Sequence, residues 1–280
     1  MVTLNTNVQS LNAQRLVNIN NANLARTTQR LSSGLRVNSA SDDPSGLAIA
    51  ESLTSQVRGD KMASEQNIQQ GQSMIQVADS GLSQIGDILQ RMRELSVQAN
   101  NTGLTTNESN ALNAEYQSLQ TAITNIATGA SFNGFHLLDN TGNGAGTTTV
   151  TLQTGWNQSS TMAVAFNNDY QANGTQINLA GTSLTNAANA QAAQTALDTA
   201  IQNVATGRSN LGAQSSSLSA LKGALDASVV ATTDARSHIT DADVATEVSN
   251  LVRQQLLQQS GASALSSANF SAQFVVKLLT

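Results

Sequence analysis

The chain has 280 residues, of which 39% are hydrophobic but only 3% aromatic and 11% charged. Because aromatic rings bury the most area per side chain, a chain so poor in them is better suited to long, closely packed helices than to a compact core. The net charge of -5 and the lack of any basic run argue against nucleic acid and anionic membrane surfaces as partners. With no cysteine and no apolar run near the roughly 20 residues that span a bilayer, disulfides, thiolate catalysis and membrane insertion are not expected.

The first 35 residues follow a helical pattern with polar interruptions, clearest between Leu24 and Leu35, where apolar spacings of four and three alternate. Small polar residues, two carboxylates and the only proline of the chain follow at 39–46. Asp43 is placed to cap a helix whose first residue is Pro44, because proline suits the first helical position.

The strongest periodic signal lies between positions 68 and 99. Its members keep a strict alternation of three and four and are Ile68, Gly71, Ile75, Ala78, Leu82, Ile85, Leu89, Met92, Ser96 and Ala99. This pattern predicts a long coiled-coil helix that needs partners along its length. The same alternation at 112–126, after the turn signal at 100–103, predicts an antiparallel return helix.

Between about 140 and 185 the helical period is lost, and short alternating stretches at 149–152 and 162–166 predict one or two small β-hairpins. A heptad pattern resumes from Ala190 to about Ala235 and predicts one long helix. A last helix is expected from 241 to 280, with two aspartates near its start, where the helix dipole favours negative charge. Its apolar end needs burial against another surface.

The predicted fold is therefore mainly α: an elongated antiparallel helical bundle or coiled coil formed by the N- and C-terminal segments, with a small β-hairpin insert. Neither end holds enough seam positions to satisfy itself, so the two ends should pair. We expect three parts: 1–45 with 237–280 as an inner terminal helical domain, 46–140 with 185–236 as a helical-bundle domain, and 141–184 as a short variable insert facing outward.

Several segments, in their order along the chain, closely resemble the bacterial flagellins. They are 30–40 (RLSSGLRVNSA) followed by Asp42 and Asp43, 46–50 (GLAIA), 89–99 (LQRMRELSVQA), 132–134 (FNG), 208–213 (RSNLGA), 235–239 (ARSHI), 241–243 (DAD) and 256–261 (LLQQSG). The resemblance covers roughly the first 140 and the last 90 residues. His238, where the family usually has arginine, and the lack of proline at 270–273 depart from the pattern.

This resemblance implies a secreted, non-enzymatic structural subunit of the extracellular flagellar filament that serves swimming motility. The first residues do not resemble a conventional signal peptide. In the family, the chain leaves the cell unfolded through a type III export apparatus, which suits the lack of cysteine and the single proline. The implied partners are further copies of itself, the export apparatus, a flagellin chaperone, the filament cap and hook-associated proteins, with no cofactor and no metal.

The resemblance places the polymerisation surface on the outer parts of both termini. The expected residues are Val8, Leu11, Leu31, Leu35, Val248, Leu251, Leu256, Phe270, Phe274, Leu278 and Leu279. An ordinary intramolecular core would use many of the same positions. Similar flagellins are also recognised by Toll-like innate receptors of a host, and the matching positions here are Gln90, Arg91, Arg93, Glu94, Leu95, Val97 and Glu115. The plainer alternative is a helix face that contacts neighbouring subunits.

Other features have simpler explanations than catalysis. Asp42 and Asp43 beside Pro44 are better explained as helix caps than as an acid/base or metal pair. His136 and His238 lie far apart, and no His-Glu-x-x-His motif is present. The alternatives left open are a hook-filament junction protein, a secreted enzyme displayed on a helical stalk, and an adhesive coiled-coil protein.

Overall fold

The computed structural model describes residues 6–141, 149–166 and 168–279, with side chains described up to Phe270. The chain folds into two compact units: unit 1 comprises Met1–Ser55 and Ala231–Thr280, and unit 2 comprises Gln56–Val230. The fold is mainly α with a β-hairpin insert, which confirms the predicted class.

The helices account for most of the described chain. Their bounds are α1 Val8–Ser33, α2 Pro44–Met62, the π-helical turn η1 Ala63–Asn67, α3 Ile68–Ala99, α4 Thr106–Gly129, α5 Ala187–Thr240 and α6 Val244–Leu279. The helix expected at 190–235 is longer than predicted at both ends. Asn186, whose side chain accepts a hydrogen bond from the Asn189 N–H (2.8 Å), precedes its first turn.

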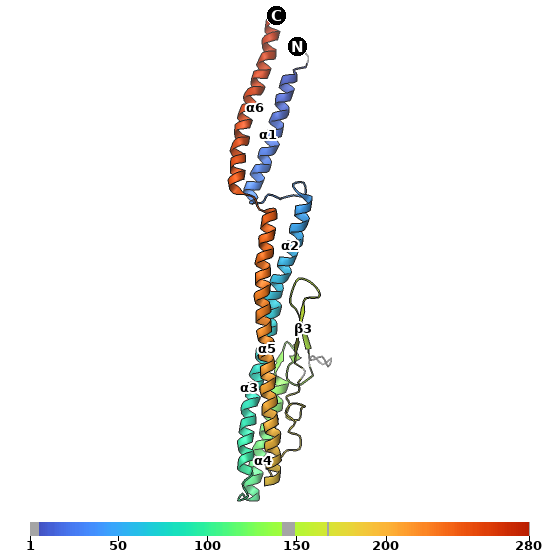
Figure 1. The fold of residues 1–280 in the computed structure, drawn as a ribbon, viewed down its shortest axis with the longest axis vertical. Coiled ribbons are helices and arrows are strands. Elements are labelled where there is room, and N and C mark those ends of the chain that lie inside the picture. The colour runs from blue at the N-terminus through green and yellow to red at the C-terminus, as the bar shows by residue number, and fades with distance from the viewer. Residues whose placement is uncertain (1–5, 142–148, 167, 280) are drawn as a thin grey trace. The chain divides into compact units, whose positions relative to one another are not determined.

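In unit 1, α1 and α6 lie side by side and run antiparallel (Figure 1). The Asn7 side chain donates to the Ala268 carbonyl (2.9 Å), and the Gln258 side chain donates to the Asn21 side-chain oxygen (3.0 Å). Residue numbers therefore rise along one helix as they fall along the other. This confirms that the two ends of the chain pair with each other.

Aspartates start two of the helices in unit 1. Asp43 Oδ1 accepts from the N–H groups of Ser45 (3.1 Å) and Gly46 (2.9 Å), so the predicted cap of α2 is confirmed. Of the two aspartates expected to start the last helix, Asp243 caps α6 by accepting from Ala245 N (3.0 Å). Asp241 instead accepts from the hydroxyl of Ser237 (2.6 Å).

These caps make stability depend on pH in a definite direction. The Gly46 N–H holds the pKa of Asp43 below its usual value of 3.8, and the Thr246 hydroxyl does the same for the pKa of Asp243. A carboxyl with a lowered folded-state pKa stabilises the fold above its unfolded pKa, and this contribution is lost as the pH falls through the folded pKa. We therefore expect the melting temperature to fall as the pH drops from about 4 toward 2.

The measurement is circular dichroism melting of the monomer between pH 6 and pH 2. Replacement of Asp43 by asparagine, which caps equally well but does not titrate, should make the acid loss shallower. Glu51→Gln is the control, since Glu51 is exposed on the same helix. If the melting temperature falls equally steeply with pH in Asp43→Asn and in Glu51→Gln, the Asp43 cap is not a source of the acid sensitivity.

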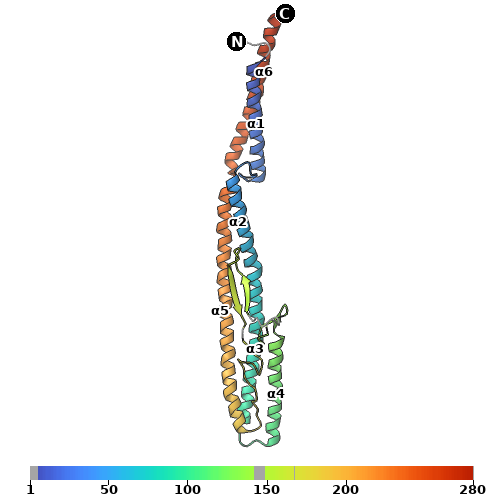
Figure 2. The same ribbon diagram turned by 90° about the vertical axis from the view of Figure 1, so that its right-hand side faces the viewer.

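Unit 2 is built on α3, with α4 and α5 beside it (Figure 2). Ion pairs give the directions: Arg208 on α5 contacts Asp79 (2.7 Å), while Arg93 contacts Asp198 further back along α5, so α3 and α5 are antiparallel. All ten predicted seam positions of α3 are buried, and so are Tyr116 and Ile123 of α4. The coiled-coil prediction for this region is confirmed.

Two antiparallel hairpins are seen among the described residues, one within the insert and one just before it. β3 (Thr149–Gln153) pairs with β4 (Thr161–Ala165), as predicted, with Thr149 opposite Ala165. The second hairpin, β1 (Ser131–Phe132) with β2 (Phe135–His136), was not predicted. The sequence does carry a signal for it, the pair Asn133-Gly134, which favours a type I′ turn. Both residues adopt the positive φ that this turn requires. The irregular segment after β4 packs on α4. The Thr182 hydroxyl of this segment is hydrogen-bonded to Tyr116 Oη of α4 (2.9 Å).

Candidate polymerisation and recognition surfaces

The faces that α1 and α6 turn toward each other are mostly polar and small. Thr27 of α1 and Glu247 of α6 are buried there, and the Ser10 hydroxyl donates to the Asn269 side chain (2.8 Å). Gly261 allows close approach, since a Cβ at this position would lie 2.9 Å from Val17 Cγ2. The seam between the two helices is therefore mixed, with half-buried leucines such as Leu24, Leu31, Leu251 and Leu265 among polar and small residues.

Among the residues of unit 1 that the structure describes, Arg30 Nε and Gln254 Oε1 are buried without a hydrogen-bond partner. The Arg30 guanidinium lies 3.5 Å from Glu247 and 3.8 Å from Asp42, which are ion-pair distances longer than a good hydrogen bond. A buried polar group without a partner costs about 1–3 kcal/mol. The pairing of α1 with α6 is thus weakly supported from within the chain.

Many large apolar side chains of these helices face solvent. Five of the predicted polymerisation residues are between 42% and 68% exposed: Val8, Leu11, Val248, Leu256 and Phe270. Leu31, Leu35 and Leu251 are half-buried. Phe274, Leu278 and Leu279 belong to α6, but their side chains lie outside the described residues.

Further exposed apolar residues extend this surface and were missed from the sequence. They are Leu16, Ile19, Val244, Val252 and Leu257. A helical-wheel comparison would have found those on α1, because the inward positions follow one three-four alternation through Ser10, Val17 and Thr27, and Leu16 and Ile19 fall outside it. We call the exposed apolar residues of α1 and α6 the outer stripe.

A network of charges marks one face of unit 2, where the receptor contacts were expected. Arg91 on α3 pairs with Glu115 on α4 (2.9 Å) and with Glu94 one turn away (3.0 Å), and these hydrogen bonds, Glu115 first, raise the pKa of Arg91. Arg93 pairs with Asp198 of α5, which raises the pKa of Arg93 and lowers that of Asp198. All these side chains are about half exposed, so each pair contributes little to stability and remains open to a partner.

The neighbouring predicted residues do not all share this face. Gln90 and Val97 are exposed, whereas Leu95 is 1% exposed and packs in the core of unit 2. A receptor cannot touch a side chain that the bundle covers. The prediction of Leu95 as a direct contact is therefore corrected: its place on the α3 seam makes it a core residue that positions the charged face.

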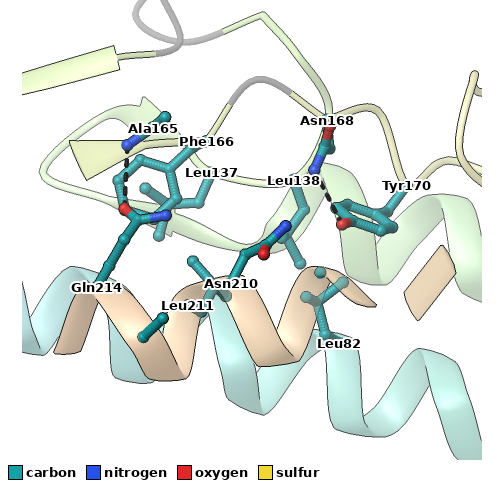
Figure 3. A pocket seen from close by; sticks show the side chains of 12 residues that line it. Leu82, Leu137, Leu138, Ala165, Phe166, Asn168, Tyr170, Asn210, Leu211 and Gln214 are labelled. Carbon is teal, nitrogen blue, oxygen red and sulfur yellow. Dashed lines mark hydrogen bonds between the residues drawn. The ribbon is translucent and has the colours of Figure 1, made fainter. Parts of the chain in front are cut away.

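A pocket of about 430 Å³ lies where the insert rests on α3 and α5 (Figure 3). Leu82, Leu138 and Phe166 line it, Gln214 Oε1 accepts from Ala165 N (3.1 Å), and Asn168 donates to Tyr170 Oη (3.1 Å). Burial raises the pKa of Tyr170, so its hydroxyl stays protonated near neutral pH. The lining contributes apolar and amide groups and no carboxylate, histidine or lysine among the described residues.

Two family models match this chain over most of its length. The bacterial flagellin N-terminal helical region matches residues 4–143, and the bacterial flagellin C-terminal helical region matches residues 194–279. The chain belongs to the bacterial flagellin family. The matched segments include the outer stripe, the charged face and the seam of α3.

Individual relatives agree with the family assignment. A flagellin of Halalkalibacterium halodurans is 38% identical, and a flagellar filament 33 kDa core protein of Treponema phagedenis is 34% identical, each with 99% of both chains covered. A solved structure assigned as a flagellar hook-associated protein of Vibrio parahaemolyticus has a TM-score of 0.58 and 17% identity over 71% of this chain and all of its own. At that identity the likeness shows the fold alone.

As a flagellin, the chain is a structural subunit of the flagellar filament. The hook-filament junction alternative is not favoured, because the full-length relatives are flagellins and filament core proteins. Among the residues that the structure describes, no helix is both long and apolar enough to cross a membrane.

Proposed function

We propose that this flagellin polymerises through unit 1, by burying the outer stripe of α1 and α6 against the same helices of other copies. The observation that carries the proposal is the outer stripe itself: ten large apolar side chains of the two helices are exposed, while many of the positions between the helices are polar or small. A pair of helices arranged this way can bury its exposed apolar side chains only against further copies. Polymerisation then completes the folding of unit 1.

A filament also needs an interface that does not close into a ring, with one patch meeting a different patch on the next copy. The outer stripe is divided between two antiparallel helices, so it offers unlike surfaces to unlike neighbours. On this proposal, 1–45 with 237–280 form the inner filament tube, 46–140 with 185–236 form the subunit body, and 141–184 face outward.

Passage through a narrow export channel in an unfolded state is part of the same proposal. The chain has no cysteine, so no disulfide can crosslink it during passage. It has a single proline, so slow X-Pro isomerisation affects its refolding at one peptide bond only. The export apparatus, a flagellin chaperone, the filament cap and hook-associated proteins are its proposed partners, by family likeness. The resulting location is the extracellular filament.

Electron microscopy of the purified full-length chain, seeded with short filament fragments, tests the polymerisation proposal. We expect long helical filaments above a critical concentration. A chain that stays monomeric in the presence of seeds, at protein concentrations far above the critical concentration of related flagellins, would overturn the proposal.

We further propose that the charged face of unit 2, namely Gln90, Arg91, Arg93, Glu94, Val97 and Glu115, is recognised by a Toll-like innate receptor. Replacement of Arg91 by alanine removes the group that pairs with both Glu94 and Glu115. We expect receptor signalling by the monomer to fall at least about tenfold, because loss of a charged interface contact costs about 2 kcal/mol or more.

The assay is a reporter cell line that carries the receptor, with the melting curve of each variant as a check on folding. Arg58→Ala, which removes an exposed arginine from a different part of the same helical run, is the matched control. Undiminished signalling by Arg91→Ala would leave this face as a contact for neighbouring subunits only.

A further inference from the structure

Trp156 is the only tryptophan of the chain, and unit 2 displays it on its surface. Its side chain is 52% exposed, whereas the other aromatic side chains described in unit 2 are buried or half-buried. A covered indole ring buries about 150–250 Å², and tryptophan is enriched among the residues that dominate binding at protein interfaces. An exposed indole on a subunit that assembles is therefore a candidate contact.

The backbone that carries this ring is firmly held. The Trp156 N–H donates to Asp60 Oδ1 (2.9 Å), and Asp60 is itself 5% exposed on α2. A Cβ at Gly59 would lie 2.6 Å from Trp156 Cβ, so the loop rests directly on the backbone of α2. The Thr154 N–H donates to the Ser160 carbonyl (2.8 Å), which closes the loop between β3 and β4. Because the loop is ordered in the monomer, the ring can make a contact at little further cost in conformational entropy.

A groove of about 730 Å³ lies between α3 and α5 on the same unit. Its floor is apolar, since Ile75 and Leu211 line it and are almost fully buried. Its wall carries an ion pair, in which Arg208 Nε donates to Asp79 Oδ1 (2.7 Å) and Arg208 Nη2 donates to Asp79 Oδ2 (3.4 Å). Both charged side chains are more than 40% exposed, so a partner can reach them.

This ion pair is a suitable base for an aromatic ring. Both hydrogen bonds leave from one edge of the guanidinium, so Asp79 does not occupy its flat faces. Guanidinium groups stack on aromatic rings, and tryptophan gives the strongest cation–π attraction among the side chains. The groove thus combines an apolar floor, a cation for the π face of a ring, and oxygen acceptors on Asp79 and Gln76 for an indole N–H.

The tryptophan loop and the groove lie on opposite sides of the seam between α3 and α5. The hairpin covers one side, where Leu152 packs on Gly71 of α3 and the Ala165 N–H donates to Gln214 of α5 (Figure 2). Ser215, about 100° further round α5 than Gln214, lines the groove instead. One face of unit 2 therefore carries the ring, and the other face carries the groove.

Trp156 cannot reach the groove of its own subunit. The Ser228 hydroxyl donates to Asp60 (3.4 Å), so the loop lies near Ser228 of α5. Arg208 lies about 30 Å back along the same helix, at about 1.5 Å per residue. A tryptophan that fills the groove therefore belongs to another molecule, and the molecule that recurs in a flagellin filament is a second copy of this chain.

We propose that Trp156 of one subunit stacks on the Arg208–Asp79 pair in the α3–α5 groove of a neighbouring subunit. The contact joins unlike patches on opposite sides of unit 2, so it is heterologous and can repeat from copy to copy without closing. It adds a contact of the subunit body to those of the outer stripe, and it rests on the proposed polymerisation.

The single tryptophan is also the probe of its own contact. When parent monomers become filaments, we expect its emission to move to shorter wavelength and its quenching by acrylamide to fall several-fold, because the indole leaves water. In Arg208→Ala filaments Trp156 should be quenched as in the monomer. In Arg208→Lys filaments, which keep the charge but lose the flat guanidinium, quenching should lie between these two limits. Lys222→Ala removes one positive charge from the same helix outside the groove, and this control should behave as the parent chain does.

Critical concentrations from sedimentation test the pairing of the two residues. Trp156→Ala and Arg208→Ala should each raise the critical concentration at least about tenfold, as the loss of a dominant interface contact does. The double variant should be little worse than either single variant, because both substitutions remove the same contact. The melting curves of all monomers should stay close to that of the parent chain, since exposed ion pairs contribute little to stability.

The outcomes separate this contact from the polymerisation itself. Parent filaments in which Trp156 is quenched as in the monomer would overturn the contact while the proposed function stands. Parental protection of Trp156 in Arg208→Ala filaments would overturn it equally, and so would fully additive effects of Trp156→Ala and Arg208→Ala on the critical concentration. A parent chain that forms no filament would overturn the proposed function and this contact together.

Discussion

Replacement of Leu11 or Leu256 by glutamate should abolish filament growth without unfolding the monomer. Both side chains belong to the outer stripe and are more than half exposed, so a carboxylate there remains in water as long as the chain is alone. In a filament the same carboxylate would be buried without a partner, which costs several kcal/mol. A cost of about 2.7 kcal/mol per subunit already raises the critical concentration about 100-fold.

The matched controls are Asn12→Glu and Gln255→Glu, which place the same charge at exposed polar positions next to the stripe on the same helices. Sedimentation gives the critical concentration, and circular dichroism reports whether unit 2 stays folded. If the stripe variants and the controls polymerise alike, the exposed leucines are not the contact. Failure of the stripe variants alone places the interface on the apolar face.

Truncation of Leu82 to alanine should produce the largest loss of stability in the monomer. Leu82 is 1% exposed on α3 and belongs to the continuous core of unit 2. Removal of a fully buried leucine side chain costs about 2–5 kcal/mol, because the transfer free energy and the cost of the cavity add. We expect the free energy of unfolding measured with urea to fall by that amount.

Two comparison variants give this result its meaning. Gln84→Ala changes an exposed position on the same helix, and Leu16→Ala removes an equal side chain from α1, where it is 55% exposed. Both should stay within about 0.5 kcal/mol of the parent chain in the monomer. If Leu82→Ala were as stable as Gln84→Ala, the α3 seam would not be the core of the folded subunit.

Together the two sets of variants separate two kinds of apolar position that look alike in the sequence. Leu82 and Leu11 are both leucines in helical repeats, yet one is covered by its own chain and the other is not. The first contributes to the stability of every monomer. The second contributes only when another copy is present, so its effect depends on protein concentration.

The sequence by itself determined the local structure with good accuracy. The alternation of three and four at 68–99 fixed the buried face of α3, because 3.6 residues per turn leaves one stripe for the core. Asp43 and Pro44 marked the start of α2, and the alternating stretches at 149–152 and 162–166 marked the hairpin. Each of these signals acts within a few residues, which is why it can be read without a partner.

Only the tertiary structure decided which face of each helix is buried and which partner covers it. It left Leu11 and Leu16 exposed but half-buried Leu31 on the same helix, because in an antiparallel pair the inward face depends on the partner and its register. It placed Leu95 in the core although its neighbours Glu94 and Val97 are exposed. It also brought the π turn at Ala63–Asn67 against groups far away along the chain, since Ser64 donates to Asp226 of α5 and Asn67 donates to the Gln153 carbonyl of the hairpin. Local periodicity specifies a helix and one apolar face, whereas the choice of contact for that face is a property of the whole fold.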